Sequence, residues 1–500
     1  MAEPLPAETD VVVVGAGTAG CALAARLAEA GRTVLLLEAG PADQPAETRD
    51  ARTMRAAVPG SPAAVEVPTE LTPTLSRSVV RGRGAGGSSA VNGCYFVRAT
   101  PADCDGWGMP EWSWAAVLPA FRRLEADRDF PDSPLHGRAG PVPVTRPAPG
   151  YEPAAAFAAA AAALGVPGEP DKNGAGPAGC GPLPSNAVDG VRISAAVAYL
   201  RGRPGLTVRG GVRVSRVLVE RGRAVGVLTA AGTVRAAEVV LSAGAVGSPE
   251  LLLRSGIGPA DALRDLGLPV VADVRGVGEG LSDHPMLQVP WRPAPGFPAP
   301  PGLALEQVLH AAPDGAPIEV LPWFRSFASL LPPWGSPSRD DGVLTLGVSL
   351  LRADSRGRLT LRSADPASPP RIAYDHLASA ADRAGLRAGV RFAAELLHTP
   401  PMAALGATGT EPADDPLSAA VLAADGALDG WIGRHLGTAV HLCGSARMGP
   451  DDDPGAVVDG RLRVRGVAGL RVVDTSVLPR VPSRGTAATA VMVGERAAEL

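Results

Sequence analysis

The sequence predicts an α/β fold that opens with a parallel sheet, and three observations carry the prediction. A β-branched apolar run at residues 11–14 is typical of a buried parallel strand. A glycine-rich turn, residues 15–20, follows it at once and leads into a stretch with helical spacing of leucines. A second apolar run at residues 34–37 then ends at Glu38. Strand, helix and strand in this order form a βαβ unit, whose two strands are parallel.

The same kinds of pattern predict the later elements. Further strands are expected around Val208 and over residues 212–214, 224–228, 234–241, 357–361 and 469–473. Amphipathic or closing helices are expected over residues 382–397 and 486–500. Another helix is expected to begin at Ser248-Pro249, because serine suits the N-cap and proline the first turn. The proline-rich region 290–337 gives no assignable pattern.

Composition limits the class of protein. The 500 residues are 46% apolar and 20% charged, which is typical of a large globular enzyme with two or three lobes. The net charge of -4 leaves no basic footprint for nucleic acid. Five irregularly spaced cysteines without a CxxC argue against a disulfide framework or a zinc site and favour a reducing compartment.

No targeting or membrane segment is expected. Residues 1–10 lack the basic and apolar regions of a signal peptide. The alanine-rich run 151–164 is too short to span a bilayer. We therefore expect a cytoplasmic protein without a transmembrane segment, and peripheral contact with the inner face of the membrane stays open.

The glycine-rich turn predicts a dinucleotide site. Gly15 permits the tight turn, Gly17 lets a pyrophosphate approach the backbone, and Gly20 lets the helix pack against the strand. The helix N-terminus offers free N–H groups and about half a positive charge to phosphates. A carboxylate at Glu38 would accept hydrogen bonds from ribose hydroxyls and repel a 2′-phosphate, which favours FAD or NAD over NADP. A glycine-rich turn without a ligand is the alternative, but the strand, helix, second strand and acid all fall in place.

Later segments carry a family resemblance. Residues Arg81 to Gly93 and Gly244 to Pro259 resemble the first and second signatures of the glucose-methanol-choline (GMC) oxidoreductase family. Three more segments resemble its later motifs: Gly278 to Pro285, His441 to Gly449 and Val457 to Pro479. The match runs from residue 10 to the end of the chain. It implies a Rossmann-like FAD-binding domain built from discontinuous segments, plus an α+β substrate domain with an antiparallel sheet.

The resemblance also implies boundaries and cofactor contacts. The FAD-binding domain would comprise residues 1–140, 186–288 and 437–500, and the substrate-binding domain residues 141–185 and 289–436. We expect non-covalent FAD, because no histidine occupies the loop near Asn92 to attach it. The small residues from Gly84 to Ala90 would let backbone N–H groups crowd an anionic or electron-rich ligand. The implied FAD-binding residues are Gly15, Gly17, Thr18, Ala19, Gly20, Glu38, Arg83, Gly87, Ser88, Asn92, Gly93, Val214, Asp474 and Thr486.

The acid–base site rests on one histidine. Oxidation of an alcohol removes a hydride from carbon and a proton from oxygen, and imidazole is a suitable proton acceptor. Within its motif, His441 is the candidate catalytic base. We interpret His435 as structural and the pair Asp283-His284 as support for the fold or the cofactor. No cluster of histidine, cysteine or acidic residues has metal-ligand spacing.

The chain departs from the family at one position. The family usually has a second histidine or asparagine where this sequence has Gly485, which offers no side chain to orient a hydroxyl. Arg484, an ordered water or the substrate itself would have to take that role, and Arg484 would otherwise be an ordinary surface charge.

Several segments resemble one branch, the GMC dehydrogenase of the mycofactocin system: residues 92–96, 189–192, 441–446 and 483–485. This implies reduced mycofactocin (mycofactocinol), a peptide-derived redox cofactor, as the CH–OH donor. Electrons would pass to a carrier, plausibly the respiratory chain. The alternatives are a generic GMC alcohol or sugar oxidase or dehydrogenase that uses oxygen or a dye-like acceptor, an FAD-containing lyase, and a non-catalytic flavoprotein.

Overall fold

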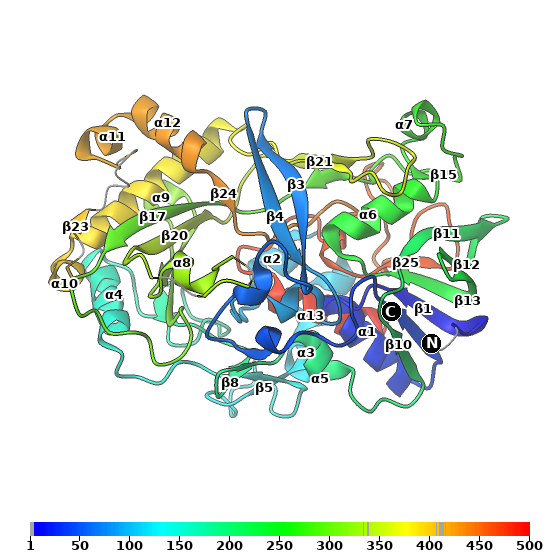
Figure 1. The fold of residues 1–500 in the computed structure, drawn as a ribbon, viewed down its shortest axis with the longest axis horizontal. Helices are drawn as coiled ribbons and strands as arrows, with labels where there is room; N and C mark the ends of the chain where they lie inside the picture. The colour runs from blue at the N-terminus through cyan, green and yellow to red at the C-terminus, as the bar shows by residue number, and fades with distance from the viewer. Residues whose placement is uncertain (1–4, 334, 338–339, 407, 410–414, 416) are drawn as a thin grey trace.

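Three large sheets and the helices that cover them form most of the described molecule. A computed structural model describes residues 5–333, 335–337, 340–406, 408–409, 415 and 417–500, so the first four residues of the N-terminal segment lie outside it. A seven-stranded sheet stands at each end, and a five-stranded sheet lies between them (Figure 1). The predicted α/β class with an additional antiparallel sheet is confirmed.

The first sheet contains the predicted βαβ unit. Its order is β10-β2-β1-β13-β12-β11, with β25 paired to β13. Strand β1 is parallel to β2 and β13, and β25 is parallel to β13. The apolar runs of β1 and β2 are buried because helices and other segments cover both faces of this sheet. The strands are β1 (Glu8–Val14), β2 (Val34–Leu37), β10 (Leu206–Arg209), β11 (Val214–Glu220), β12 (Arg223–Thr229), β13 (Gly232–Leu241) and β25 (Leu470–Val472).

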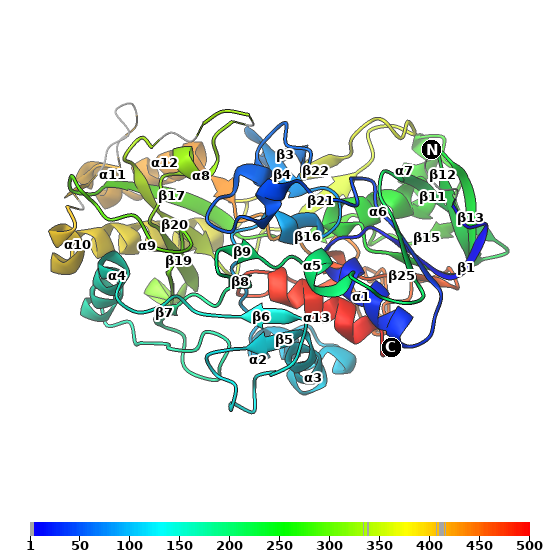
Figure 2. The same cartoon turned by 60° about the horizontal axis from the view of Figure 1, so that its bottom comes forward.

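The first and last long helices of the chain cover this sheet together. Helix α1 (Thr18–Glu29) lies beside α13 (Ala487–Ala497), blue against red in Figure 2. A Cβ atom added to Gly494 would lie 2.3 Å from the carbonyl oxygen of Ala19, so only glycine permits this approach. The N-terminal unit is therefore completed by the end of the chain.

The second sheet is antiparallel and is covered by α9 (Ala380–His398) and α4 (Glu152–Ala163). A Cβ atom on Gly389 of α9 would lie 3.0 Å from Val348 Cγ1, which shows how closely α9 packs on the sheet. The proline-rich region left unassigned from sequence supplies two short strands, β18 and β19. The strands in spatial order are β23 (Thr408–Gly409), β17 (Pro285–Arg292), β20 (Leu344–Leu350), β19 (Ile318–Trp323), β18 (Gln307–Ala311) and β7 (Cys180–Pro182), with β24 (Gly437–Thr438) also on β17.

The third sheet joins the other two. It consists of β16 (Glu279–Leu281), β21 (Gly357–Thr360), β22 (Arg371–Ala373), β3 (Ala64–Thr72) and β4 (Leu75–Gly82). These strands come from both of the predicted domains. The partition of the chain into two domains therefore stays a prediction.

One predicted helix start is wrong. Helix α6 spans Gly244–Arg254, so Ser248 and Pro249 lie inside it. Pro249 has no N–H to donate to the carbonyl of Ala245, one turn earlier. The hydroxyl of Ser445 donates to that carbonyl instead, at 2.6 Å. The Ser248 hydroxyl donates to Asp474 at 2.5 Å, so both residues serve tertiary contacts and not a helix start.

Two further expectations concern cysteines and membranes. All five cysteines are buried and free, as their irregular spacing predicts. Over the ranges that the structure describes, every helix falls short of the length and apolar content needed to traverse a bilayer.

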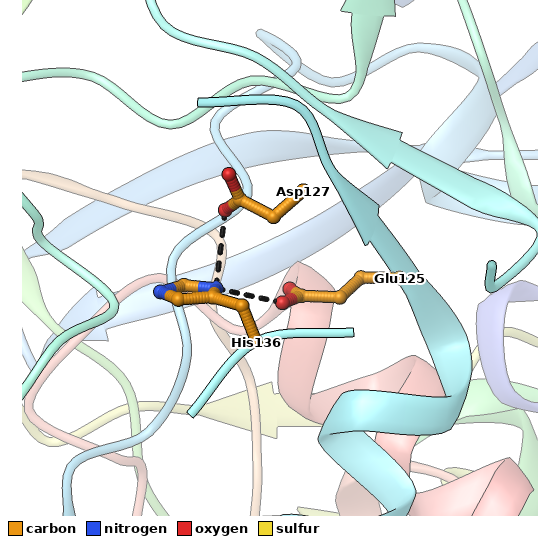
Figure 3. A group of neighbouring side chains, drawn as sticks. All are labelled: Glu125, Asp127 and His136. Carbon is orange, nitrogen blue, oxygen red and sulfur yellow. Dashed lines mark hydrogen bonds and ion pairs between the residues drawn. The ribbon is translucent and has the colours of Figure 1, made fainter. Parts of the chain in front are cut away.

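A buried ionic network joins side chains between residues 98 and 171, after the segment Arg81 to Gly93 that resembles the first family signature. Figure 3 shows Glu125 and Asp127, both on β5 (Glu125–Asp127), turned toward the ring of His136. Ring Nδ1 lies 2.8 Å from Glu125 and 3.1 Å from Asp127, and Nε2 lies 2.8 Å from Asp171. The three side chains in the figure are close enough to suggest a metal site. Both ring nitrogens face carboxylates, however, so the ring donates at both positions as an imidazolium.

Two arginines complete the charge balance of the network. Arg98 pairs with Glu125, and Arg146 pairs with Asp127 at 2.6 Å and with Asp171 at 2.8 Å. Arg146 also lies 3.5 Å from the exposed carboxylate of Asp129. Three cations thus meet three carboxylates inside the network and a fourth at its exposed rim. Although burial opposes protonation, hydrogen bonds from the ring to Asp127, Asp171 and Glu125 raise the pKa of His136 to about 10.

The network predicts a pH dependence of stability. The folded-state pKa of His136 is above its unfolded value of about 6.5, so its stabilising contribution is complete below that value and is lost as pH rises through about 10. We expect the melting temperature to fall between pH 7 and 10. His136→Asn should melt lower at pH 7 and show a flatter profile, whereas the exposed control His398→Asn should match the wild type. Parallel profiles for the His136 variant and the wild type would contradict this.

Candidate active site

The predicted cofactor residues meet at one edge of the first sheet. Gly15 follows β1, Glu38 follows β2, Ser242 follows β13 and Asp474 lies two residues after β25. Because these strands are parallel, their carboxyl ends share an edge, which is where open α/β sheets bind ligands. A Cβ atom on Gly15 would lie 2.5 Å from the Ser242 carbonyl oxygen, and Gly15 has φ +105°. The tight turn predicted for Gly15 is therefore present.

The carboxylate of Glu38 joins three loops. One oxygen accepts a hydrogen bond from the Ala16 amide at 2.9 Å. The other accepts from the amides of Gly40 at 2.8 Å and Gly84 at 3.0 Å. A carboxylate has about four acceptor sites, so a further donor such as a ribose hydroxyl can still bind. The sequence predicted the ligand contact and missed the three backbone amides.

The glycine-rich signature packs directly on the first loop. The Gly86 amide donates to the Ala16 carbonyl at 2.7 Å. A Cβ atom on Gly87 would lie 2.8 Å from the Cα of Gly17, and both Gly86 and Gly87 have positive φ. Two loops that are 70 residues apart in sequence thus touch backbone to backbone at the proposed pyrophosphate position.

The nearby predicted residues are held by local contacts. Ser88 Oγ accepts from the Gly82 amide at 3.2 Å, and Asn92 Oδ1 accepts from the Cys94 amide at 3.1 Å. The open side of Gly93 faces Trp323, 3.7 Å from an added Cβ atom. Arg83 is exposed.

The turn itself fits a pyrophosphate. A Cβ atom on Gly20 would lie 2.1 Å from the Gly15 carbonyl oxygen, so the fold requires glycine there. Gly17 differs: its φ is -76°, and an added Cβ atom would have its nearest protein contact at 3.6 Å. Helix α1 begins without a side-chain cap and without an acidic residue in its first turn. The amides from Gly17 to Gly20 are thus left for an anion, and the glycine at 17 is explained by a ligand that approaches closely.

The three remaining predicted residues differ in their settings. The buried Asp474 accepts from the Gly244 and Ser476 amides, each at 2.9 Å, and burial raises the pKa of its carboxyl. Thr486 is the N-cap of α13, and its side chain makes no capping hydrogen bond. Val214 is buried at the start of β11.

His441 lies beside the segment that carries Asp474. The Ala446 amide donates to the Ser476 carbonyl at 2.9 Å, which ties the histidine motif to η6 (Thr475–Val477). Ring Nδ1 of His441 lies 3.0 Å from Nδ1 of His284, and the two rings meet edge to face. Burial, the repulsion from His284 when that ring is protonated, and the charge of Arg81 hold the pKa of His441 well below its usual value. Burial lowers the pKa of His284 to about 4, so both rings are neutral at pH 7.

Asp283 positions both histidines through their backbones. Its Oδ1 accepts from the amides of His441 at 2.8 Å and His284 at 2.7 Å. Its Oδ2 accepts from the hydroxyl of Thr438 at 2.6 Å, and burial raises the pKa of this carboxyl to about 6. The sequence identified Asp283 and His284 as support and gave no signal for Thr438.

Strain accompanies this arrangement. Val440, directly before His441, has φ +63°, a conformation that β-branched residues rarely adopt. Arg81 donates to its carbonyl at 2.6 Å, and the Val440 amide donates to Thr438 at 3.0 Å. Tertiary contacts thus hold a backbone that is unfavourable by itself.

The space beside Gly485 is filled by an aromatic ring. A Cβ atom on this buried glycine would lie 3.4 Å from Tyr95 Cδ1. The Tyr95 hydroxyl donates to Glu319 at 3.0 Å, and His310 Nε2 lies 3.0 Å from the same carboxylate oxygen. Sequence reasoning missed Glu319 and His310, which lie on strands in the region that it left unassigned.

His435 lies in a different setting. It pairs with Asp415 at 2.9 Å and stacks on Trp431, which is consistent with a structural role.

Comparisons with known proteins define the class. Residues 9–286 and 353–494 match the N- and C-terminal models of the GMC oxidoreductase family. A GMC-type oxidoreductase of Rhodococcus erythropolis is 42% identical over 98% of both chains. An oxygen-dependent choline dehydrogenase of Pseudomonas syringae is 35% identical over 98% of this chain and 93% of that protein.

Solved structures agree with the family match. Pyridoxine 4-oxidase from Mesorbium loti has a TM-score of 0.89 and 29% identity over 98% of both chains. An FAD-dependent oxidoreductase from Chaetomium thermophilum has a TM-score of 0.83 and 26% identity over 98% of both chains.

The protein is thus an oxidoreductase. It belongs to the GMC oxidoreductase family, and its cofactor is FAD.

The turn geometry predicts different effects of alanine at Gly17 and at Gly20. Gly17→Ala should fold, because the added methyl meets only an ordinary contact, but it should bind FAD roughly tenfold or more weakly, about 1.4 kcal/mol, because the methyl faces the ligand. Gly20→Ala should not fold, because its methyl overlaps a backbone oxygen. Melting of the apoproteins and FAD titration measure the two effects. FAD affinity equal to wild type in Gly17→Ala would refute the ligand explanation.

Proposed function

We propose that this protein oxidises a CH–OH donor to the corresponding carbonyl compound, with His441 as the proton acceptor. The observation that carries the proposal is the neutral, half-buried imidazole of His441 beside the segment that carries Asp474. Bound FAD supplies the hydride acceptor. Choline dehydrogenase and pyridoxine 4-oxidase, to which the chain is similar, support the same reaction class.

The tautomer of His441 follows from its neighbour. Within the described part of the chain, Nε2 of His441 makes no hydrogen bond, whereas Nδ1 is engaged with His284. To accept the substrate proton at Nε2, the ring must carry its own proton on Nδ1 and donate it to His284. Asp283 accepts hydrogen bonds from the backbone amides of both histidines and so fixes their relative positions for this contact. His284 is thereby a positioning residue.

The finer assignment concerns the donor and the acceptor. We propose reduced mycofactocin as the donor, supported by the resemblance of segments 92–96, 189–192, 441–446 and 483–485 to the GMC dehydrogenase of that system. Electrons would pass to a carrier or the respiratory chain, which suits a cytoplasmic enzyme in contact with the inner face of the membrane. The Tyr95 ring fills the space beside Gly485. This arrangement suits a donor that needs no second imidazole or amide at that position.

The test of the base is His441→Ala. The variant should keep FAD and lose about 10²–10⁴ in the rate of anaerobic flavin reduction by the donor, since a general base contributes that much. His435→Ala is the matched control and should behave as wild type. A panel of alcohols that includes reduced mycofactocin identifies the donor. Bleaching of the wild-type flavin by a donor would exclude a lyase or a non-catalytic flavoprotein, and rapid peroxide formation in air would favour an oxidase.

The mode of FAD attachment is tested separately. We predict that acid precipitation releases all of the flavin into the supernatant, because the loop at Asn92 holds no histidine for a covalent bond. Absorbance of the supernatant and the pellet measures the two fractions. Yellow colour that stays with the pellet would show a covalent link.

A further inference from the structure

A pocket of about 760 Å³ opens to solvent beside the candidate active site. Its walls include part of α2 (Pro101–Gly106), the loop 172–178 and the turn between β18 and β19. Ser483 and Arg484 line it and directly precede Gly485. The pocket therefore reaches the chain segment where the family places its second acid–base group.

The described lining of this pocket is strongly cationic. One carboxylate, Glu169, stands against four cationic side chains: Arg98, Lys172, Arg352 and Arg484. Two of the cations are neutralised within the protein, since Arg98 pairs with Glu125 and Lys172 pairs with Glu169. Arg352 is exposed, so water solvates its charge.

Arg484 is different, because it is buried and has no counter-ion. Only 8% of the residue is exposed. Its Nη1 donates to the carbonyl of Ser483 at 2.7 Å, and its buried Nε has no hydrogen-bond partner. Across the ranges that the structure describes, no carboxylate lies within ion-pair distance of this guanidinium. An unpaired buried cation is costly, so a fold that retains one without a ligand loses stability.

Glu319, on β19, does not form an ion pair with Arg484. Its carboxyl accepts from Tyr95 and contacts His310. Burial raises the pKa of Glu319, and the charges of Arg484 and Lys172 oppose this rise. Among the described residues, Arg484 thus has no direct ion-pair partner.

We propose that this pocket binds a carboxylate group of a ligand through Arg484, and that the CH–OH donor carries such a group. A guanidinium offers two parallel N–H donors that match the two oxygens of a carboxylate. The charge of Arg484 also acts on His284, which contacts the ring of His441. The bound anion would therefore lie near the reacting hydroxyl. This second half rests on the proposed function, whereas carboxylate binding does not.

Calorimetric titration of the FAD-loaded protein with acetate tests the binding. The buffer holds no other carboxylate, and ionic strength is low. Wild type should bind acetate saturably, and Arg484→Met should bind it roughly tenfold to hundredfold more weakly, the loss expected for a charge-assisted hydrogen-bonded pair. Arg480→Met is the matched control, because this exposed arginine lies on the same loop and outside the pocket lining, and it should bind as wild type.

Three results would overturn the carboxylate site. These are no saturable acetate binding by wild type, equal affinity in Arg484→Met, and tighter binding of inorganic phosphate than of acetate. Should Arg484→Met fail to retain FAD, Arg484→Lys replaces it: the charge stays and the fork is lost, so acetate should still bind several-fold more weakly. Equal affinity in Arg484→Lys and wild type would likewise contradict recognition by the fork.

Kinetics test whether the donor uses the site. For a hydroxy acid and its uncharged methyl ester, Arg484→Met should raise KM for the acid by about tenfold or more and leave KM for the ester unchanged. Equal changes in KM for the acid and the ester would contradict the proposal that the donor binds through Arg484. If no alcohol reduces the wild-type flavin, the proposed function fails, while the acetate titration still decides the binding site.

Discussion

The close approach of two backbone loops around Gly17 is the constraint on which the rest of the site depends. Gly87 can touch Gly17 only because Gly87 has no side chain, and the carboxylate of Glu38 receives amides from three separate loops. Each contact removes donors or acceptors that would otherwise be buried without partners. The amides at the start of α1 are left over, and these are what an anionic cofactor requires.

The histidine pair shows how the fold sets proton chemistry. Burial holds both rings neutral, so a proton can be accepted at one nitrogen while the other is oriented by its neighbour. Asp283 contributes through backbone amides and leaves the rings free of a carboxylate that would raise their pKa values. The strained Val440 before His441 indicates that the placement is enforced by surrounding contacts and not by local preference.

Sequence patterns predicted the elements whose physical cause is local. The apolar runs of β1 and β2, the turn at Gly15 and the amphipathic α9 were all found in this way. Ser248-Pro249 misled, because a serine and a proline at a helix start look the same as a serine and a proline that serve Asp474 and Ser445. Thr438 could not be predicted, because its contact to Asp283 depends on the pairing of β24 with β17, more than 100 residues earlier in the sequence. Glu319 and His310 could not be predicted, because the hydroxyl that Glu319 binds belongs to Tyr95, 224 residues away in the sequence. The sequence could not predict that Arg484 is buried without an ion-pair partner, because burial depends on all the segments that pack around it.

The packing of α13 on α1 has a consequence for folding. Helix α1 meets its partner helix more than 450 residues later in the sequence, and β25 joins the first sheet from residues 470–472. Contacts between residues so distant in sequence form slowly, because the loss of chain entropy precedes the gain from the contact. Helix α1 therefore keeps an apolar face uncovered until α13 docks on it.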